Sequence, residues 1–87
     1  MAVRAIRMYA GDNVAVVTAE VKAGDLVRLD GGIEVRAAEA IPRGGKVALT
    51  PIAAGATVVR YGEVIGLATG DIAAGQHVHT HNLGATQ

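Results

Sequence analysis

The three histidines of the chain lie together near its C-terminal end, in the run HVHTH from His77 to His81. Imidazole titrates near neutral pH and binds metal ions, so these side chains are the first candidates for proton transfer or ligation. Alternate side chains of a β-strand share a face, which predicts that all three rings project to one side. Residues at i and i+2, such as His79 and His81, are about 7 Å apart on a strand, close enough to share one metal ion or one acidic substrate.

His77 and His81 are twice as far apart on an extended strand, so one ion is not expected to bind all three rings. The alternative interpretation is an exposed strand face whose polar side chains happen to be histidines. The spacing alone leaves both interpretations open.

Three further polar side chains are candidates for substrate binding. Asn82 follows the histidines and could orient a hydroxyl or carboxylate, or only stabilise a turn. Lys46 follows two glycines and could pair with an anionic ligand, or be a solvated surface residue. Tyr61 precedes Gly62 at a predicted hairpin tip, where it offers a hydroxyl or a packing surface. The sequence shows no P-loop, no Ser–His–Asp arrangement and no convincingly spaced pair of carboxylates.

Four similar short units indicate how these side chains are positioned. The pattern [Ile/Val]-x-x-Gly-x-x-Val occurs as VKAGDLV from Val21, IPRGGKV from Ile41, IAAGATV from Ile52 and IAAGQHV from Ile72. Each unit predicts an apolar anchor, a tight turn with a glycine, and a strand that begins near the valine. The units do not recur at one fixed period, so we interpret them as four corners of one β domain and not as a repeat array.

The stretches between these corners predict strands. LVRLD and IEVRA flank Asp30-Gly31-Gly32, a typical hairpin signature. Further strands are expected near 3–8, 14–18, 46–50, 57–60, 63–68 and 77–81. The fold class is therefore all-β, a small barrel-like or clip-like domain that occupies residues 1–87 with one core.

Composition excludes several function classes. Eight basic residues balance eight acidic ones and only two aromatic residues occur, so no basic field or stacking surface for nucleic acid is present. Without cysteine there are no disulfides and no thiolate chemistry. No apolar run is long enough for a membrane span or a signal peptide, which predicts a cytoplasmic protein. A core of small aliphatic side chains predicts assembly with a partner or as a homo-oligomer.

The chain from Pro42 to Leu83 resembles the N-terminal SAF domain of the altronate/galactarate dehydratase family. The matching runs are PRGGKVALT, IAAGATVVRYG, VIGLA and DIAAGQHVHTHN, and the start around Asp12-Asn13-Val14-Ala15 is similar to that of the family. The resemblance implies a β-clip fold and a part in removing water from a small sugar acid such as altronate or galactarate. It also implies a divalent metal bound mainly by a large subunit, with Fe²⁺ first and Mn²⁺ or Mg²⁺ as alternatives.

On this resemblance the chain is a small subunit that completes the active site of a large dehydratase subunit. His79 and His81 would act as an acid–base pair or as metal or substrate ligands, while Lys46, Asn82 and Tyr61 would bind substrate. Two alternatives are a subunit of sulfolactate sulfo-lyase and a non-catalytic module that binds sugar acids. One departure stands out, because the family pattern has a histidine where this chain has Gly45. His77 occupies a position that the pattern leaves free, so it inherits no role.

Overall fold

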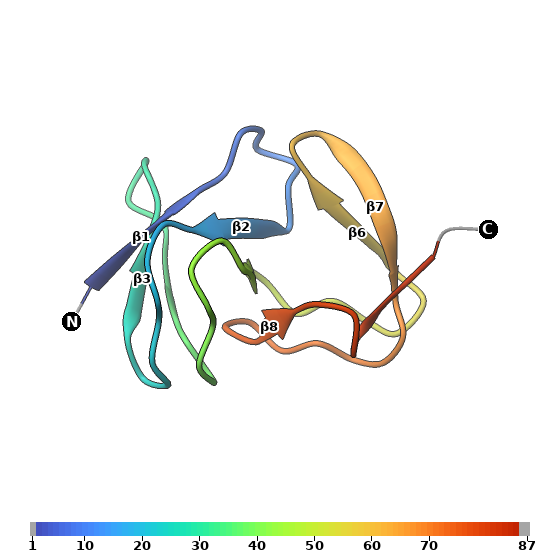
Figure 1. Cartoon of the computed structure of the whole chain (residues 1–87). Helices are drawn as coiled ribbons and strands as arrows, with labels where there is room; N and C mark the ends of the chain where they lie inside the picture. Colours follow the sequence, from blue (N-terminus) through green and yellow to red (C-terminus); the bar gives the residue numbers. More distant parts are fainter. Residues whose placement is uncertain (1, 86–87) are drawn as a thin grey trace.

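The computed structural model describes residues 2–85, and among these it contains strands and turns but no helix (Figure 1). No segment of this range forms a helix long and apolar enough to cross a membrane. The all-β class and the small clip-like architecture predicted from the sequence are confirmed. The strands are β1 (Ala2–Ile6), β2 (Val14–Val17), β3 (Leu26–Arg28), β4 (Glu34–Arg36), β5 (Lys46–Ala48), β6 (Thr57–Arg60), β7 (Glu63–Ala68), β8 (His77–Val78) and β9 (Leu83–Gly84).

The strands form one sheet in the order β4-β3-β1-β2-β5-β8 and a second in the order β6-β7-β9. β1 pairs with β3 in parallel, and the other pairs are antiparallel. Figure 1 shows β2 and β8 in the middle of the molecule, with β1 and β3 on one side and the β6–β7 hairpin on the other. The middle strands are therefore covered on both sides.

The buried side chains form two clusters instead of the single core predicted from chain length. On β2 and β5, neighbouring residues alternate between the clusters: Ala15 and Val47 belong to the first, whereas Val14 and Ala48 belong to the second. Since alternate side chains of a strand point to opposite faces, the middle layer contributes to both clusters.

The four predicted corners are confirmed, because Gly24, Gly44, Gly55 and Gly75 all have positive φ. The anchors pair as isolated bridges, Val21 with Ile41 and Ile52 with Ile72. The sequence interpretation missed one regularity here, which is that the two pairs of corners repeat each other.

This repeat is visible in the hydrogen bonds. Gly24 donates to the Ala37 carbonyl, and 31 residues later Gly55 donates to the Ala68 carbonyl. The bond from Gly44 to Val17 likewise recurs as the bond from Gly75 to Ala48. Residues 17–47 therefore have the same local architecture as residues 48–78, and the repeat places Lys46 and His77 at equivalent positions on the adjacent strands β5 and β8.

Asp12 joins the loop after β1 to the tip of the β6–β7 hairpin. Its carboxylate is 4% exposed and accepts N–H bonds from Tyr61 at 2.9 Å and Gly62 at 2.8 Å. Tyr61 has φ of 54°, which is unusual outside glycine, and the two bonds hold it in this turn. Burial raises the pKa of Asp12, but the N–H groups of Gly62, Tyr61 and Tyr9 outweigh it, so its pKa lies below the ordinary value of 3.8.

Asp12→Asn is expected to lower the free energy of unfolding by about 2–3 kcal/mol, because the neutral amide replaces one of the two acceptor oxygens with a donor. Urea unfolding followed by far-ultraviolet circular dichroism measures the change. The matched control is Asp30→Asn, since Asp30 pairs with Arg4 on the surface with both side chains largely exposed. That control should change stability by less than about 1 kcal/mol.

The stabilisation by Asp12 also depends on pH with a definite sign. A carboxyl whose pKa is lower in the folded than in the unfolded chain stabilises fully above its unfolded pKa, here about 3.8. That contribution is lost as the pH falls through the lower folded value. Acid unfolding curves of wild type and Asp12→Asn should therefore converge below pH 3.8, and curves that stay parallel there would contradict this role.

Candidate functional site

The candidate site begins where β8 ends. His77 and Val78 pair with Val47 and Lys46 of β5, but after Val78 the chain leaves the sheet and turns. The predicted strand over 77–81 is therefore wrong beyond Val78. The cause is Asn82, whose side-chain oxygen accepts the His79 N–H at 2.9 Å and whose side-chain NH₂ donates to the His77 carbonyl at 2.9 Å. The amide thus replaces the ladder bonds that a longer strand would have made.

The turn gathers the three imidazoles into a histidine cluster, defined as His77, His79 and His81. The ring centroids of His77 and His79 are 5.4 Å apart with nearly parallel planes, 5° from each other. Those of His77 and His81 are 5.9 Å apart with planes at 54°. An extended strand would have separated this second pair much further. The turn therefore places the rings of both His79 and His81 next to that of His77.

His77 is the half-buried member of the cluster, whereas His79 and His81 are exposed. Its backbone N–H donates to Oε2 of Glu39 at 3.1 Å. Burial, and then the charge of His79, lower the pKa of His77 below its ordinary 6.5, while the charge of Glu39 opposes the change. The neutral ring is therefore favoured near pH 7, and a neutral imidazole can accept a proton.

Gly45 lies under the His77 ring. A Cβ at this position would be 3.1 Å from Nε2 of His77 and 2.8 Å from Cγ2 of Ile41. The φ of Gly45 is not positive, so the backbone conformation does not require glycine at this position. What glycine provides here is space for the neighbouring side chains. A histidine at 45, as in the family pattern, would bring a Cβ into close contact with Ile41, the Pro42 carbonyl and the His77 ring.

Lys46 is not brought into contact with the histidine cluster. Residues directly opposite each other share a face, so Lys46 lies on the face of Val78 and His77 on the face of Val47. Within residues 2–85 no hydrogen bond or ion pair joins Lys46 to a histidine. Burial, and then the charge of Arg60, lower the pKa of Lys46, while the Lys46 charge in turn contributes to lowering the pKa of His77.

The two remaining predicted substrate contacts, Asn82 and Tyr61, interact with other groups of the chain. Asn82 uses its amide to hold the turn, as described above. Tyr61 lies at the confirmed hairpin tip, 41% exposed, with the Arg60 guanidinium 5.3 Å from its ring centroid. Sequence reasoning did not identify Glu39 as a neighbour of His77 or Arg60 as a neighbour of the Tyr61 ring. Neither residue belongs to a recognisable sequence pattern, and these contacts are seen only in the folded chain.

A metal ion was implied by the resemblance, and the described residues fit it only in part. From residue 2 to residue 85 no group of three or more His, Cys, Asp or Glu side chains could hold a metal ion. A catalytic metal site requires about three protein ligands. Residues 2–85 by themselves therefore do not present a complete ligand set, and His79 and His81 would supply at most part of one.

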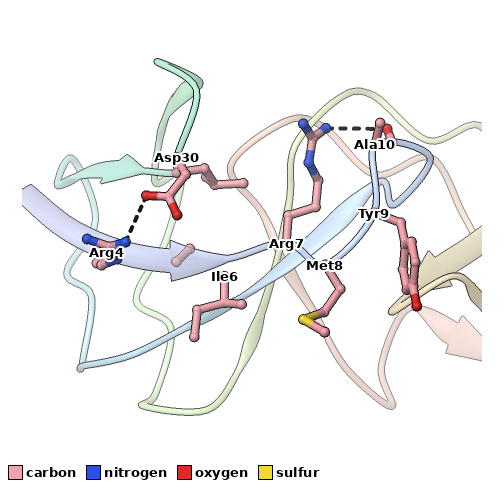
Figure 2. Close-up of a pocket in the computed structure, with 9 residues that line it drawn as sticks. Arg4, Ile6, Arg7, Met8, Tyr9, Ala10 and Asp30 are labelled. Atoms are coloured by element: carbon pink, nitrogen blue, oxygen red, sulfur yellow. Dashed lines mark hydrogen bonds and ion pairs between the residues drawn. The ribbon is translucent and has the colours of Figure 1, made fainter.

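A surface pocket beside β1 is separate from this cluster (Figure 2). Arg4 and Arg7 are among its lining residues, and no histidine is. Arg4 pairs with Asp30 at 2.7 Å, and Arg7 donates to the Ala10 carbonyl at 3.4 Å. Both guanidinium groups are thus engaged within the chain, so the histidine cluster is the better candidate for function.

The chain resembles known proteins over almost its whole length. The family model of the altronate/galactarate dehydratase SAF domain matches residues 3–86. The chain is 49% identical over 77 residues to altronate dehydratase of Escherichia coli K12, and 41% identical over 75 residues to galactarate dehydratase (L-threo-forming) of the same organism. These matches cover 88% and 84% of this chain, but only 15% and 14% of the relatives.

A shorter relative is covered much more completely. The chain is 36% identical over 80 residues to (2R)-sulfolactate sulfo-lyase subunit alpha of Chromohalobacter salexigens, which spans 85% of each protein. Similarity to this domain therefore occurs both inside long dehydratases and in a short protein called a subunit.

Glu39→Gln is expected to lower the pKa of His77 further below 6.5, because the carboxylate charge that favours the imidazolium is removed. Following the imidazole Hε1 proton of His77 by NMR across a pH titration measures this. Glu34→Gln is the matched control, since Glu34 pairs with Arg28 and is not among the groups that act on His77. An unchanged or higher His77 pKa in Glu39→Gln would refute this electrostatic description.

Proposed function

We propose a function from one premise: this chain belongs to the altronate/galactarate dehydratase SAF domain family. On that premise the chain is the small subunit of a sugar-acid dehydratase of the altronate or galactarate type. It completes an active site whose larger part belongs to a separate large subunit, and its substrate is a small acidic sugar. The observation that carries the proposal is the gathering of three imidazoles at the end of β8.

The chemistry of dehydration suits such a cluster. One imidazole takes the proton from the carbon beside the carboxylate, and the electron pair of that C–H bond moves into the carboxylate to give an enediolate. That electron pair then forms a C=C bond to the neighbouring carbon as its C–O bond breaks, and a second, protonated imidazole gives its proton to the departing hydroxyl, which leaves as water. In our proposal His79 and His81, the exposed members, share these two roles.

Positive charge must also stabilise the enediolate, whose two oxygens are those of the substrate carboxylate. Lys46 is the proposed contact to the carboxylate, and it would have to reach round β8, the edge strand, from the other face. A divalent metal, Fe²⁺ or alternatively Mn²⁺ or Mg²⁺, would supply Lewis-acid charge when bound. In this proposal its ligands come mainly from the large subunit, consistent with the incomplete set in the described part of the chain.

A second candidate is the elimination of sulfite from sulfolactate. The similarity to (2R)-sulfolactate sulfo-lyase subunit alpha of Chromohalobacter salexigens favours it, because that similarity extends over 85% of the relative's length. The proton transfers are similar and only the leaving group differs, so the two activities would use the same histidines. A non-catalytic module that binds sugar acids is the third candidate, and tight binding by the isolated chain without a large subunit would favour it.

The test is a chimera in which this chain replaces the matching 77-residue segment of Escherichia coli altronate dehydratase. The wild-type chimera is expected to dehydrate altronate, and His79→Ala or His81→Ala should lower kcat by about 10²–10⁴-fold, the usual contribution of general acid–base catalysis. Formation of the keto acid measures turnover.

Thr80→Ala is the matched control, because Thr80 is exposed and lies between the two histidines. It should leave turnover unchanged. If the chimera folds and turns over equally with both histidines replaced, the proposed role of the cluster fails. Activity on sulfolactate, but not on altronate, when the chain is placed in a sulfo-lyase would favour the second candidate.

A further inference from the structure

His77 is the histidine to which sequence reasoning gives no role, yet both ring contacts of the cluster run through it. Its ring lies parallel to that of His79 at 5.4 Å and is tilted to that of His81 at 5.9 Å. In the range 2–85 no ring contact joins His79 to His81 directly. The two exposed imidazoles are therefore related to each other through the half-buried one.

The backbone of His77 is fixed on both sides. Its N–H donates to Glu39 at 3.1 Å, and its carbonyl accepts from the Asn82 amide at 2.9 Å. The residue also belongs to β8, which pairs with β5. His79 and His81, in contrast, stand on an exposed turn, where side chains would exchange among several rotamers unless a neighbour restrains them.

The ring of His77 also lies close to Gly45. The position that a Cβ of residue 45 would take is 3.1 Å from Nε2 of His77, a tight contact. The ring can approach residue 45 this closely because that residue has no side chain. Two backbone hydrogen bonds and half-burial make His77 the most restrained member of the cluster.

We propose that His77 is a positioning residue, whose ring, close to Gly45, holds the imidazoles of His79 and His81 in one arrangement. This inference rests on the proposed function, in which those two imidazoles transfer protons. A ring displaced by about 1 Å can cost on the order of 100-fold in rate, so a stacked neighbour that restricts rotamers is a sufficient reason for the arrangement. The stacking surface of His77 serves this role, and its nitrogens do not take part in the reaction.

The turnover test uses the chimera described above with three forms of residue 77. His77→Ala should lower kcat for altronate by about 10-fold to 100-fold with a smaller change in KM, because binding groups remain but the reacting imidazoles are no longer aligned. His77→Phe keeps a flat ring without nitrogens and should restore most of kcat. Turnover unaffected by His77→Ala, or His77→Phe as impaired as His77→Ala, would overturn the positioning role.

The second test uses the isolated chain and does not depend on the enzyme. In His77→Ala the imidazole NMR signals of His79 and His81 should move toward those of an unfolded chain, while urea unfolding shows that the fold remains. Gly45→Ala should move the His77 signals, whereas Gly70→Ala should not, since nothing lies within 4 Å of a Cβ built on Gly70. Unmoved signals in His77→Ala would overturn the inference, even if the chimera is inactive and the proposed function fails for another reason.

Discussion

The geometry of the site depends on the side-chain amide of Asn82. Its oxygen accepts the His79 N–H and its NH₂ donates to the His77 carbonyl. One side chain thus binds the backbone of two of the three histidines. The backbone N–H of Asn82 also donates to the His79 carbonyl, and β9 then pairs with β7, so backbone bonds close the same turn. The distance between the rings of His77 and His81 is short because this turn ends the strand.

The second constraint is the layer of β2, β5 and β8 between the two hydrophobic clusters. Its strands are short, and β2 and β5 contribute buried aliphatic side chains to both clusters, whereas Lys46 and His77 are half-buried at the ends of β5 and β8. β8 is the edge of the larger sheet, which leaves the histidine turn open to solvent and to a neighbouring protein. A domain of this construction can present a small polar cluster but not enclose a substrate, which suits a part that contributes to a shared site.

Much of the fold could be predicted from the sequence because its signals are local. The glycine corners, the Asp30-Gly31-Gly32 hairpin and the Tyr61-Gly62 tip follow from backbone conformations that few residues adopt, and the structure confirms them. The repeat of the two corner pairs with an offset of 31 residues was overlooked, although the units that begin at Val21 and Ile41 recur at Ile52 and Ile72; which anchors pair with each other is seen only in the fold. The presence of two clusters likewise follows from the strand order and not from composition.

The site was predictable in its residue types and less so in its geometry. The alternation rule put all three rings on one face, with His79 and His81 as the close pair and His77 far from His81. The structure instead brings His77 next to both, since a side-chain amide three residues after His79 outweighs strand propensity. The same rule, applied to the observed register, puts Lys46 on the opposite face from His77. The contribution of Gly45 lay beyond sequence reasoning, because a glycine that leaves space for a ring 32 positions away has no local signature.

Nuclear Overhauser contacts between imidazole protons, recorded on the isolated chain with labelled histidine, test the convergence of the three rings most directly. If the turn gathers the rings as described, contacts join His77 to His79 and His77 to His81, and both vanish in Asn82→Ala. Contacts between His77 and His79 alone, with His81 pointing away, would mean that the strand continues past Val78 and that no three-ring cluster exists.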